Sequence, residues 1–119
     1  MKYMLLIQQG DAPNPYEAEK WAALSEAEQQ DIGSAYRAVS ETPGVTPGQQ
    51  LQPPEMATTV RVQDGRTLTT DGPFVAVKEA LGGWLLYEAD DIDAAIELAS
   101  RVPAAQQGGA VEVRPIVEW

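Results

Sequence analysis

The residues of this chain whose types and spacing could support chemistry lie in the stretch TDGPFVAVKE, residues 70–79. A carboxylate that is withdrawn from water beside a lysine can serve as a general base or as the anchor of a ligand. This pattern makes Asp71 the candidate catalytic residue and Lys78 a candidate binding residue for a small anionic ligand. The alternative is a structural turn, because Asp accepts backbone N–H bonds, Gly supplies backbone freedom and Pro fixes φ. The turn is the better supported interpretation, and the chemical one stays open.

Two more residues belong to the candidate ligand-binding site. Phe74 could stack on a ligand, or it could anchor a core or a dimer interface. Arg37 is expected on a helix from which it, like its neighbour Tyr36, could reach a cleft at a sheet edge, although a surface position is the commoner state of an arginine.

The composition excludes many other kinds of site. The 119 residues include no histidine and no cysteine, so a thiolate nucleophile, a histidine-based triad, an imidazole base and an ordinary zinc site are all excluded. The acidic residues at 88–93 lack the spacing of a calcium loop, and acids at a helix N-terminus explain them better. Gly82-Gly83 does not resemble a phosphate-binding loop. No metal and no cofactor are expected.

The charge balance bears on partners. Eight basic residues against eighteen acidic ones give a formal net charge of −10, which disfavours direct binding to nucleic acid. No apolar run is long enough to span a bilayer, and nothing points to a signal peptide. The lack of cysteine excludes a disulfide framework, so a cytoplasmic location is expected.

The hydrophobic periodicity and the turn residues predict an alternation of strands and helices. A capping-box pattern at Ser25–Glu28 predicts the start of the longest helix. Asp64-Gly65 between β-rich segments predicts a hairpin, and the proline-punctuated region before it is expected to be loop-rich. The expected elements are strands at 2–8, 82–87 and 110–118, helices at about 14–24, 25–41 and from 90 or 91 to 102, and a hairpin at 58–70.

This order fits a single domain, residues 1–119, with an α+β fold of the ferredoxin-like sandwich type: an antiparallel sheet with helices on one face. The first strand and the strand at 82–87 would be central. Both are apolar at consecutive positions, so whichever side chains face the helices, the others are apolar too. Leaving about four such side chains in water forgoes about 1.5–3 kcal/mol each. A homodimer through the sheet face is therefore predicted.

The motif at Asp71–Phe74, with Lys78-Glu79 and Leu81-Gly82-Gly83, resembles the DGPF motif of the YCII-related proteins. The opening residues 1–7, the segment Leu51-Gln52-Pro53-Pro54 and the closing residues 111–116 fit the same family, so the resemblance covers almost the whole chain. It implies a ferredoxin-like fold that forms a dimeric α/β barrel with a cleft near the motif. Relatives in the wider superfamily resemble lyases or isomerases of small cyclic acids, and the DGPF branch is often found with sigma factors.

This chain departs from the family pattern at two points. Val75-Ala76-Val77 stands where the family usually has Ala-Glu-Thr, and the histidine proposed as a base in some relatives is absent. Two functions are therefore carried forward. One is a small-ligand-binding homodimer, with a weak lyase or isomerase activity as its catalytic form. The other is a non-catalytic module that docks on a transcription regulator of the sigma-factor type.

Overall fold

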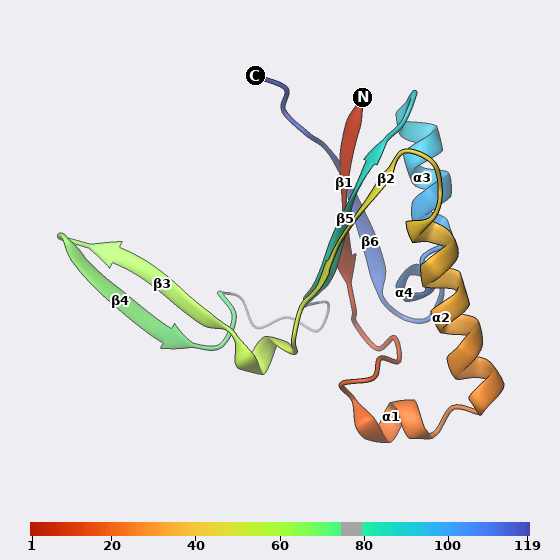
Figure 1. Cartoon of the computed structure of the whole chain (residues 1–119). Coiled ribbons are helices and arrows are strands. Elements are labelled where there is room, and N and C mark those ends of the chain that lie inside the picture. The colour runs from red at the N-terminus through yellow and green to blue at the C-terminus, as the bar shows by residue number, and fades with distance from the viewer. Residues whose placement is uncertain (75–79) are drawn as a thin grey trace.

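The computed structural model describes residues 1–74 and 80–119 and contains a four-stranded sheet, a separate hairpin and a layer of helices (Figure 1). The strands of the main sheet lie in the order β2-β5-β1-β6, and β3 pairs with β4 alone. The elements are β1 (Lys2–Gln8), α1 (Ala18–Ala22), α2 (Glu26–Ser40), β2 (Val45–Gln50), the 3-10 turn η1 (Pro54–Met56), β3 (Thr58–Gln63), β4 (Arg66–Asp71), β5 (Leu81–Glu88), α3 (Ile92–Ser100), α4 (Pro103–Gln106) and β6 (Ala110–Pro115).

The centre of the sheet is β1, which is antiparallel to both β5 and β6. Along β1 burial alternates, and Tyr3, Leu5 and Ile7 are the buried positions. Leu5 lies opposite Leu85 in β5, which is also buried. These side chains form one core with residues from α2, α3 and α4, so this is the face of the sheet that the helices cover.

Two helices begin at the residues that the capping patterns predict. Ser25 Oγ accepts the backbone N–H of Glu28, and the Glu28 carboxylate accepts the backbone N–H of Ser25, so the capping box before α2 is complete. Asp91 Oδ1 accepts the backbone N–H of Ala94 at the start of α3. Helix α2 presents the buried Ile32 and Val39 to the sheet, as its apolar spacing predicts.

The second face of the main sheet carries no helix (Figure 1). Because side chains alternate along a strand, it holds Met4 and Leu6 of β1 and their register partners Leu86 and Trp84 of β5. All four are partly exposed. We call these four residues the open face. The expectation that the central strands are apolar on both sides is therefore confirmed.

The edge strand β2 corrects the expectation of a loop-rich middle. Pro47 and Gly48 are unfavourable in strands, but β2 pairs with β5 and lies at the edge of the sheet, where a proline is tolerated. The hairpin turn is confirmed, since Asp64 and Gly65 have φ values of 51° and 74°. The α+β class with an antiparallel sheet is also confirmed. No helix among the described residues is long and apolar enough to cross a membrane.

Candidate functional site

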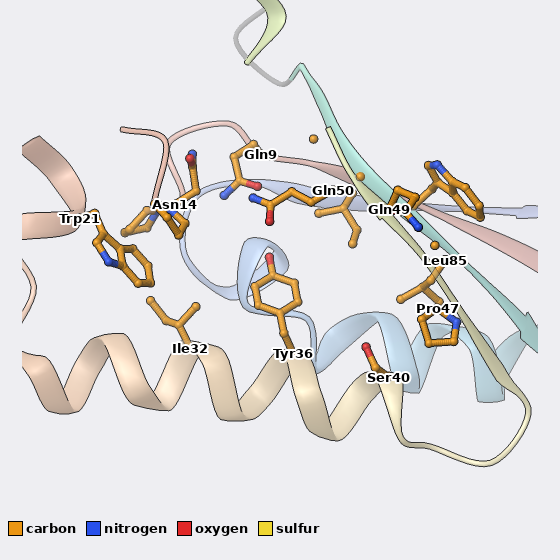
Figure 2. Close-up of a pocket in the computed structure, with 17 residues that line it drawn as sticks. Gln9, Asn14, Trp21, Ile32, Tyr36, Ser40, Pro47, Gln49, Gln50 and Leu85 are labelled. Carbon is orange, nitrogen blue, oxygen red and sulfur yellow. The ribbon is translucent and has the colours of Figure 1, made fainter. Parts of the chain in front are cut away.

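A cleft of about 210 Å³ lies between α2 and the β2–β5 side of the sheet. Its walls come from α1, α2, β2, β5 and the loop after β1 (Figure 2). The lining combines apolar groups, side-chain amides, one phenol and one aliphatic hydroxyl, and none of the described lining residues carries a formal charge. The labelled lining residues are Gln9, Asn14, Trp21, Ile32, Tyr36, Ser40, Pro47, Gln49, Gln50 and Leu85.

Tyr36 is the titratable group of this lining. Its side chain rises from α2 with the hydroxyl directed toward the amide ends of Gln9 and Gln50 (Figure 2). Burial raises the pKa of the Tyr36 phenol above its usual value of 10.0, and the backbone N–H of Ala104 offsets part of that increase. The phenol is therefore protonated at neutral pH and can donate a hydrogen bond to an acceptor in the cleft.

Gln9 supplies the complementary polar group. Its Nε2 donates to the backbone oxygen of Ala12 at 3.1 Å, which fixes the amide and leaves Oε1 as an acceptor. Asn14 is also held, because its Nδ2 donates to Glu17 at 3.1 Å and its Oδ1 accepts the backbone N–H of Tyr16 at 2.9 Å. The amides at this end of the cleft are thus ordered by local hydrogen bonds before any ligand arrives.

Irregular strand pairing shapes the same end of the cleft. The β1–β5 register shifts between Ile7 and Gln8, and the β2–β5 register shifts between Pro47 and Gln50. Such irregularities bend a strand and redirect its side chains, and they are common beside functional sites. Here they turn the ends of β1 and β2 so that Gln9 and Gln50 border one cleft.

A second hollow of about 370 Å³ adjoins the cleft. The two share Gln9, Asn14, Gln50 and Gly82 as lining residues. The outer hollow adds two carboxylates, Glu17 and Glu55. Its described lining includes no lysine or arginine. Glu17 pairs with Lys20 at 3.0 Å, so Glu55 is the main source of negative charge on the side that these residues form.

Comparison with known proteins assigns the chain to a family. Residues 1–119 match the sequence profile of the YCII-related domain. The chain belongs to the YCII-related family. An uncharacterised protein of Rhizobium meliloti (strain 1021) is 33% identical over 87 residues, which cover 72% of this chain and 70% of that relative.

The residues that the sequence of this YCII-related chain singled out do not line the cleft. Asp71 is exposed at the end of β4, where its neighbour Gly72 has a φ of 100°. The backbone N–H of Gly72 donates to Ala57 at 2.7 Å, and the Thr59 hydroxyl donates to the Gly72 oxygen at 2.8 Å. Gly72 therefore supplies the backbone freedom that the turn interpretation assigns to it, but no described residue donates a hydrogen bond to the Asp71 carboxylate. A chemical role of Asp71 stays a prediction.

Phe74 and Arg37 also lie away from the cleft lining. Phe74 is 70% exposed, and the Arg61 guanidinium of β3 lies over its ring, 4.8 Å from the centroid. Arg37 is on the exposed side of α2. Lys78 lies outside the described residues. Of the predicted site residues that the structure describes, none borders the cleft.

Sequence reasoning placed Tyr36 on a helix from which it could reach a cleft, and Tyr36 borders the cleft. It missed the glutamines as site residues, because uncharged side chains from separate segments give no local motif. The available signal was indirect: two pairs of glutamines, Gln8-Gln9 and Gln49-Gln50, lie at the ends of two strands. A polar side chain there needs a hydrogen-bond partner or contact with water. Within the described part of the chain, no group of three or more carboxylates is arranged to hold a metal ion.

Proposed function

We propose that this YCII-related protein binds a small, uncharged ring compound that carries a hydrogen-bond acceptor, in the cleft between α2 and the β2–β5 side of the sheet. The observation that carries the proposal is the lining itself. It offers one partly buried phenol as a donor, oriented amides and apolar walls, without a charged side chain among the described lining residues. Concave, mostly apolar sites with a few oriented polar groups are typical of small-molecule binding.

The charge of the ligand follows from the surroundings of the cleft. A buried anion needs a cation or several donors to offset its desolvation, and the described lining supplies no cation. Glu55 in the outer hollow repels an anion further, as does the net charge of −10. An uncharged compound avoids both costs. This proposal therefore differs from the anionic ligand expected from Lys78.

The size of the ligand follows from the volume. An apolar cavity of about 150 Å³ accommodates benzene, so the cleft of about 210 Å³ has room for one ring with a small substituent. A carbonyl on that substituent would accept the Tyr36 hydroxyl proton, and a donor on it would bind Gln9 Oε1. The ring of the ligand would lie against Trp21 and Ile32, which line the end of the cleft nearest α1 (Figure 2).

The proposal includes a homodimer with a ferredoxin-like protomer, in which a second copy covers the open face and completes a dimeric α/β barrel. Its support is the partial exposure of Met4, Leu6, Trp84 and Leu86 on a face without helices. Covering these side chains is worth about 1.5–3 kcal/mol for each one that becomes fully buried. That total is comparable with the whole stability of a small domain.

Benzamide and benzoate form a matched pair of probes, because they share a ring and a planar substituent and differ in charge at neutral pH. Binding is measured by the fluorescence of Trp21 and Trp84, which both line the cleft, in a chain in which Trp119→Phe removes an exposed tryptophan at the C-terminus. We expect benzamide to bind saturably and Tyr36→Phe to weaken it. Benzoate should bind more weakly than benzamide.

The same titration has a clear contrary result. Tighter binding of benzoate than of benzamide would show that a cation serves the site and would overturn the uncharged class. Equal binding of benzamide to the wild type and to the Tyr36→Phe variant would remove the phenol from the site. The lyase or isomerase form of the function and the docking of a transcription regulator stay predictions.

A further inference from the structure

The hairpin formed by β3 and β4, residues Thr58–Asp71, stands apart from the rest of the protein, and we call it the arm. Every arm residue is exposed except Thr59, which is partly buried. An isolated two-stranded hairpin is marginally stable in water, because it has no second layer to bury its apolar side chains. An arm of this kind is stable when another surface covers one of its faces.

The two faces of the arm differ. One carries Arg61 and Leu68, which are register partners, and Phe74 packs on Arg61 from beyond the end of β4. The other carries Val60 and Val62, opposite Thr69 and Thr67. Val60 is 59% exposed and Val62 is 66% exposed. The valine face is apolar and has no covering residue among those described.

The position of the arm indicates what covers it. The arm projects from the side of the main sheet opposite to the helices, which is the side of the open face (Figure 1). A molecule that lies on the open face therefore comes within reach of the arm. The chain therefore has an open apolar sheet face and, projecting from the same side, an arm with two exposed valines, so two copies related by a twofold axis would each offer both.

The areas support this pairing. Four strands about 4.8 Å apart and about 20–23 Å long give the open side of the sheet a footprint of about 400 Å². A stable interface needs about 800 Å² from each partner. A six-residue hairpin is about 20 Å long and about 10 Å wide, so it covers about 200 Å². Each copy would contribute its own arm and the surface that its partner's arm covers. These two regions together supply the half of the interface area that the sheet footprint does not provide.

We infer that the valine face of the arm, Val60 and Val62, packs on a second copy of this chain in the dimer that forms through the open face. This inference rests on the proposed homodimer and adds a second contact region to it. The arm is electrically balanced, with Arg61 and Arg66 against Asp64 and Asp71, whereas the whole chain has a charge of −10. An arm with no net charge can therefore approach an acidic partner without the repulsion that the rest of the surface would meet.

The test compares two double variants of the full chain by sedimentation equilibrium. Val60→Lys with Val62→Lys places two charges on the valine face, and Gln63→Lys with Thr70→Lys places the same two charges on the other face of the arm. One buried valine is worth about tenfold in affinity, so we expect the valine-face variant to weaken the dimer about a hundredfold. The control variant should stay within about threefold of the wild type.

Met4→Lys separates this inference from the proposed homodimer, because Met4 lies on the open face and not on the arm. If Met4→Lys yields monomers while the valine-face variant keeps the wild-type affinity, the arm inference is overturned and the sheet dimer stands. If the wild type is itself monomeric at micromolar concentration, the proposed homodimer and the arm inference are both overturned. The arm would then contact a protein other than a second copy. Circular dichroism of each variant tests whether the main sheet is intact. The arm substitutions should leave the spectrum unchanged, because the arm residues are not buried against that sheet.

Discussion

The ring of Trp84 in β5 lies against Gly48 of the neighbouring strand β2, so closely that a Cβ atom on Gly48 would overlap both the indole and the Trp84 carbonyl oxygen. Both residues border the cleft. Strand β2 can therefore pass beside Trp84 only because position 48 has no side chain. This contact links the edge of the sheet, the open face and one wall of the cleft.

Gly48→Ala should lower the free energy of unfolding by about 1–3 kcal/mol, because the added methyl group must displace Trp84 or the backbone of β2. It should also weaken the binding of benzamide, since β2 forms part of the cleft wall. Urea denaturation measures the first effect, and the fluorescence titration measures the second.

Gly33→Ala is the matched control. Gly33 lies within α2, is exposed, and has no atom within 4 Å of the place that a Cβ would take. This substitution should stabilise the protein by about 0.5–1 kcal/mol, the usual gain from alanine in a helix interior. Equal effects of the two substitutions would contradict the close contact at Trp84.

Tyr36→Phe should weaken benzamide binding by about two- to tenfold, the range expected when one neutral hydrogen bond of about 0.5–1.5 kcal/mol is lost. The ring that packs between α2 and the sheet is preserved, so the far-ultraviolet circular dichroism spectrum should not change. Ile32→Val, which trims the apolar wall of the same cleft without removing a polar group, is the comparison. A larger loss from Ile32→Val than from Tyr36→Phe would indicate that the phenol does not bind the ligand.

The raised pKa of Tyr36 also predicts how stability depends on pH. Burial holds the phenol protonated in the folded state, so its pKa is higher there than in the unfolded chain. The stabilisation is complete below the unfolded value of about 10 and is lost as the pH rises through the folded pKa. Thermal unfolding followed above pH 10 should therefore show a steeper loss of stability for the wild type than for Tyr36→Phe. Parallel curves would contradict this.

Strands and helix starts could be predicted where the sequence carries a local signal. The capping box at Ser25–Glu28, the turn Asp64-Gly65 and the apolar run of β1 each act through neighbouring residues, and each prediction was confirmed. The first helix, expected from about residue 14, begins at Ala18 instead, and no side-chain hydrogen bond caps it. Strand β2 could not be predicted, because Pro47 and Gly48 have no strand preference and only pairing with β5 makes them a strand. Tertiary contact overrides propensity at such an edge.

The buried face of α3 shows a similar limit. The apolar spacing predicts one face made of Ile92, Ala95, Ile96, Ala99 and Val102. Ala95, Ala99 and Val102 are buried, whereas Ile92 and Ile96 are exposed and Leu98 is buried in their place. The alanines allow the helix to lie close to the sheet, which a row of isoleucines would prevent. The glutamines of the cleft were missed for a different reason, because they are uncharged and come together only through irregular strand pairing.

Ser25→Ala should destabilise the protein by about 0.5–2 kcal/mol, because the first turn of α2 loses the hydroxyl that accepts the Glu28 N–H at 3.1 Å. Helix α2 carries Ile32 and Tyr36 into the cleft, so fraying at its start should also raise the amplitude of local hydrogen exchange there. Ser25→Asp, which restores an acceptor at the cap, should recover most of the loss. If Ser25→Asp does not restore the stability, the destabilisation by Ser25→Ala does not come from the loss of the helix cap.

Dimerisation should strengthen with salt, because each copy carries a charge of −10 and two such copies repel. The Debye length falls from about 10 Å at about 0.1 M salt to about 3 Å at about 1 M, so the dissociation constant should fall several-fold over this range. The exposed ion pair of Arg114 with Glu112 at 2.7 Å lies opposite Met4 and Leu6 in the strand register. It is internal to one copy and adds little to the salt dependence. Asp31→Asn on the helix side should leave the slope almost unchanged, since that position lies far from the open face. A dissociation constant that rises with salt would mean that ion pairs between copies hold the dimer, and the apolar contact argued from the open face and the arm would then be secondary.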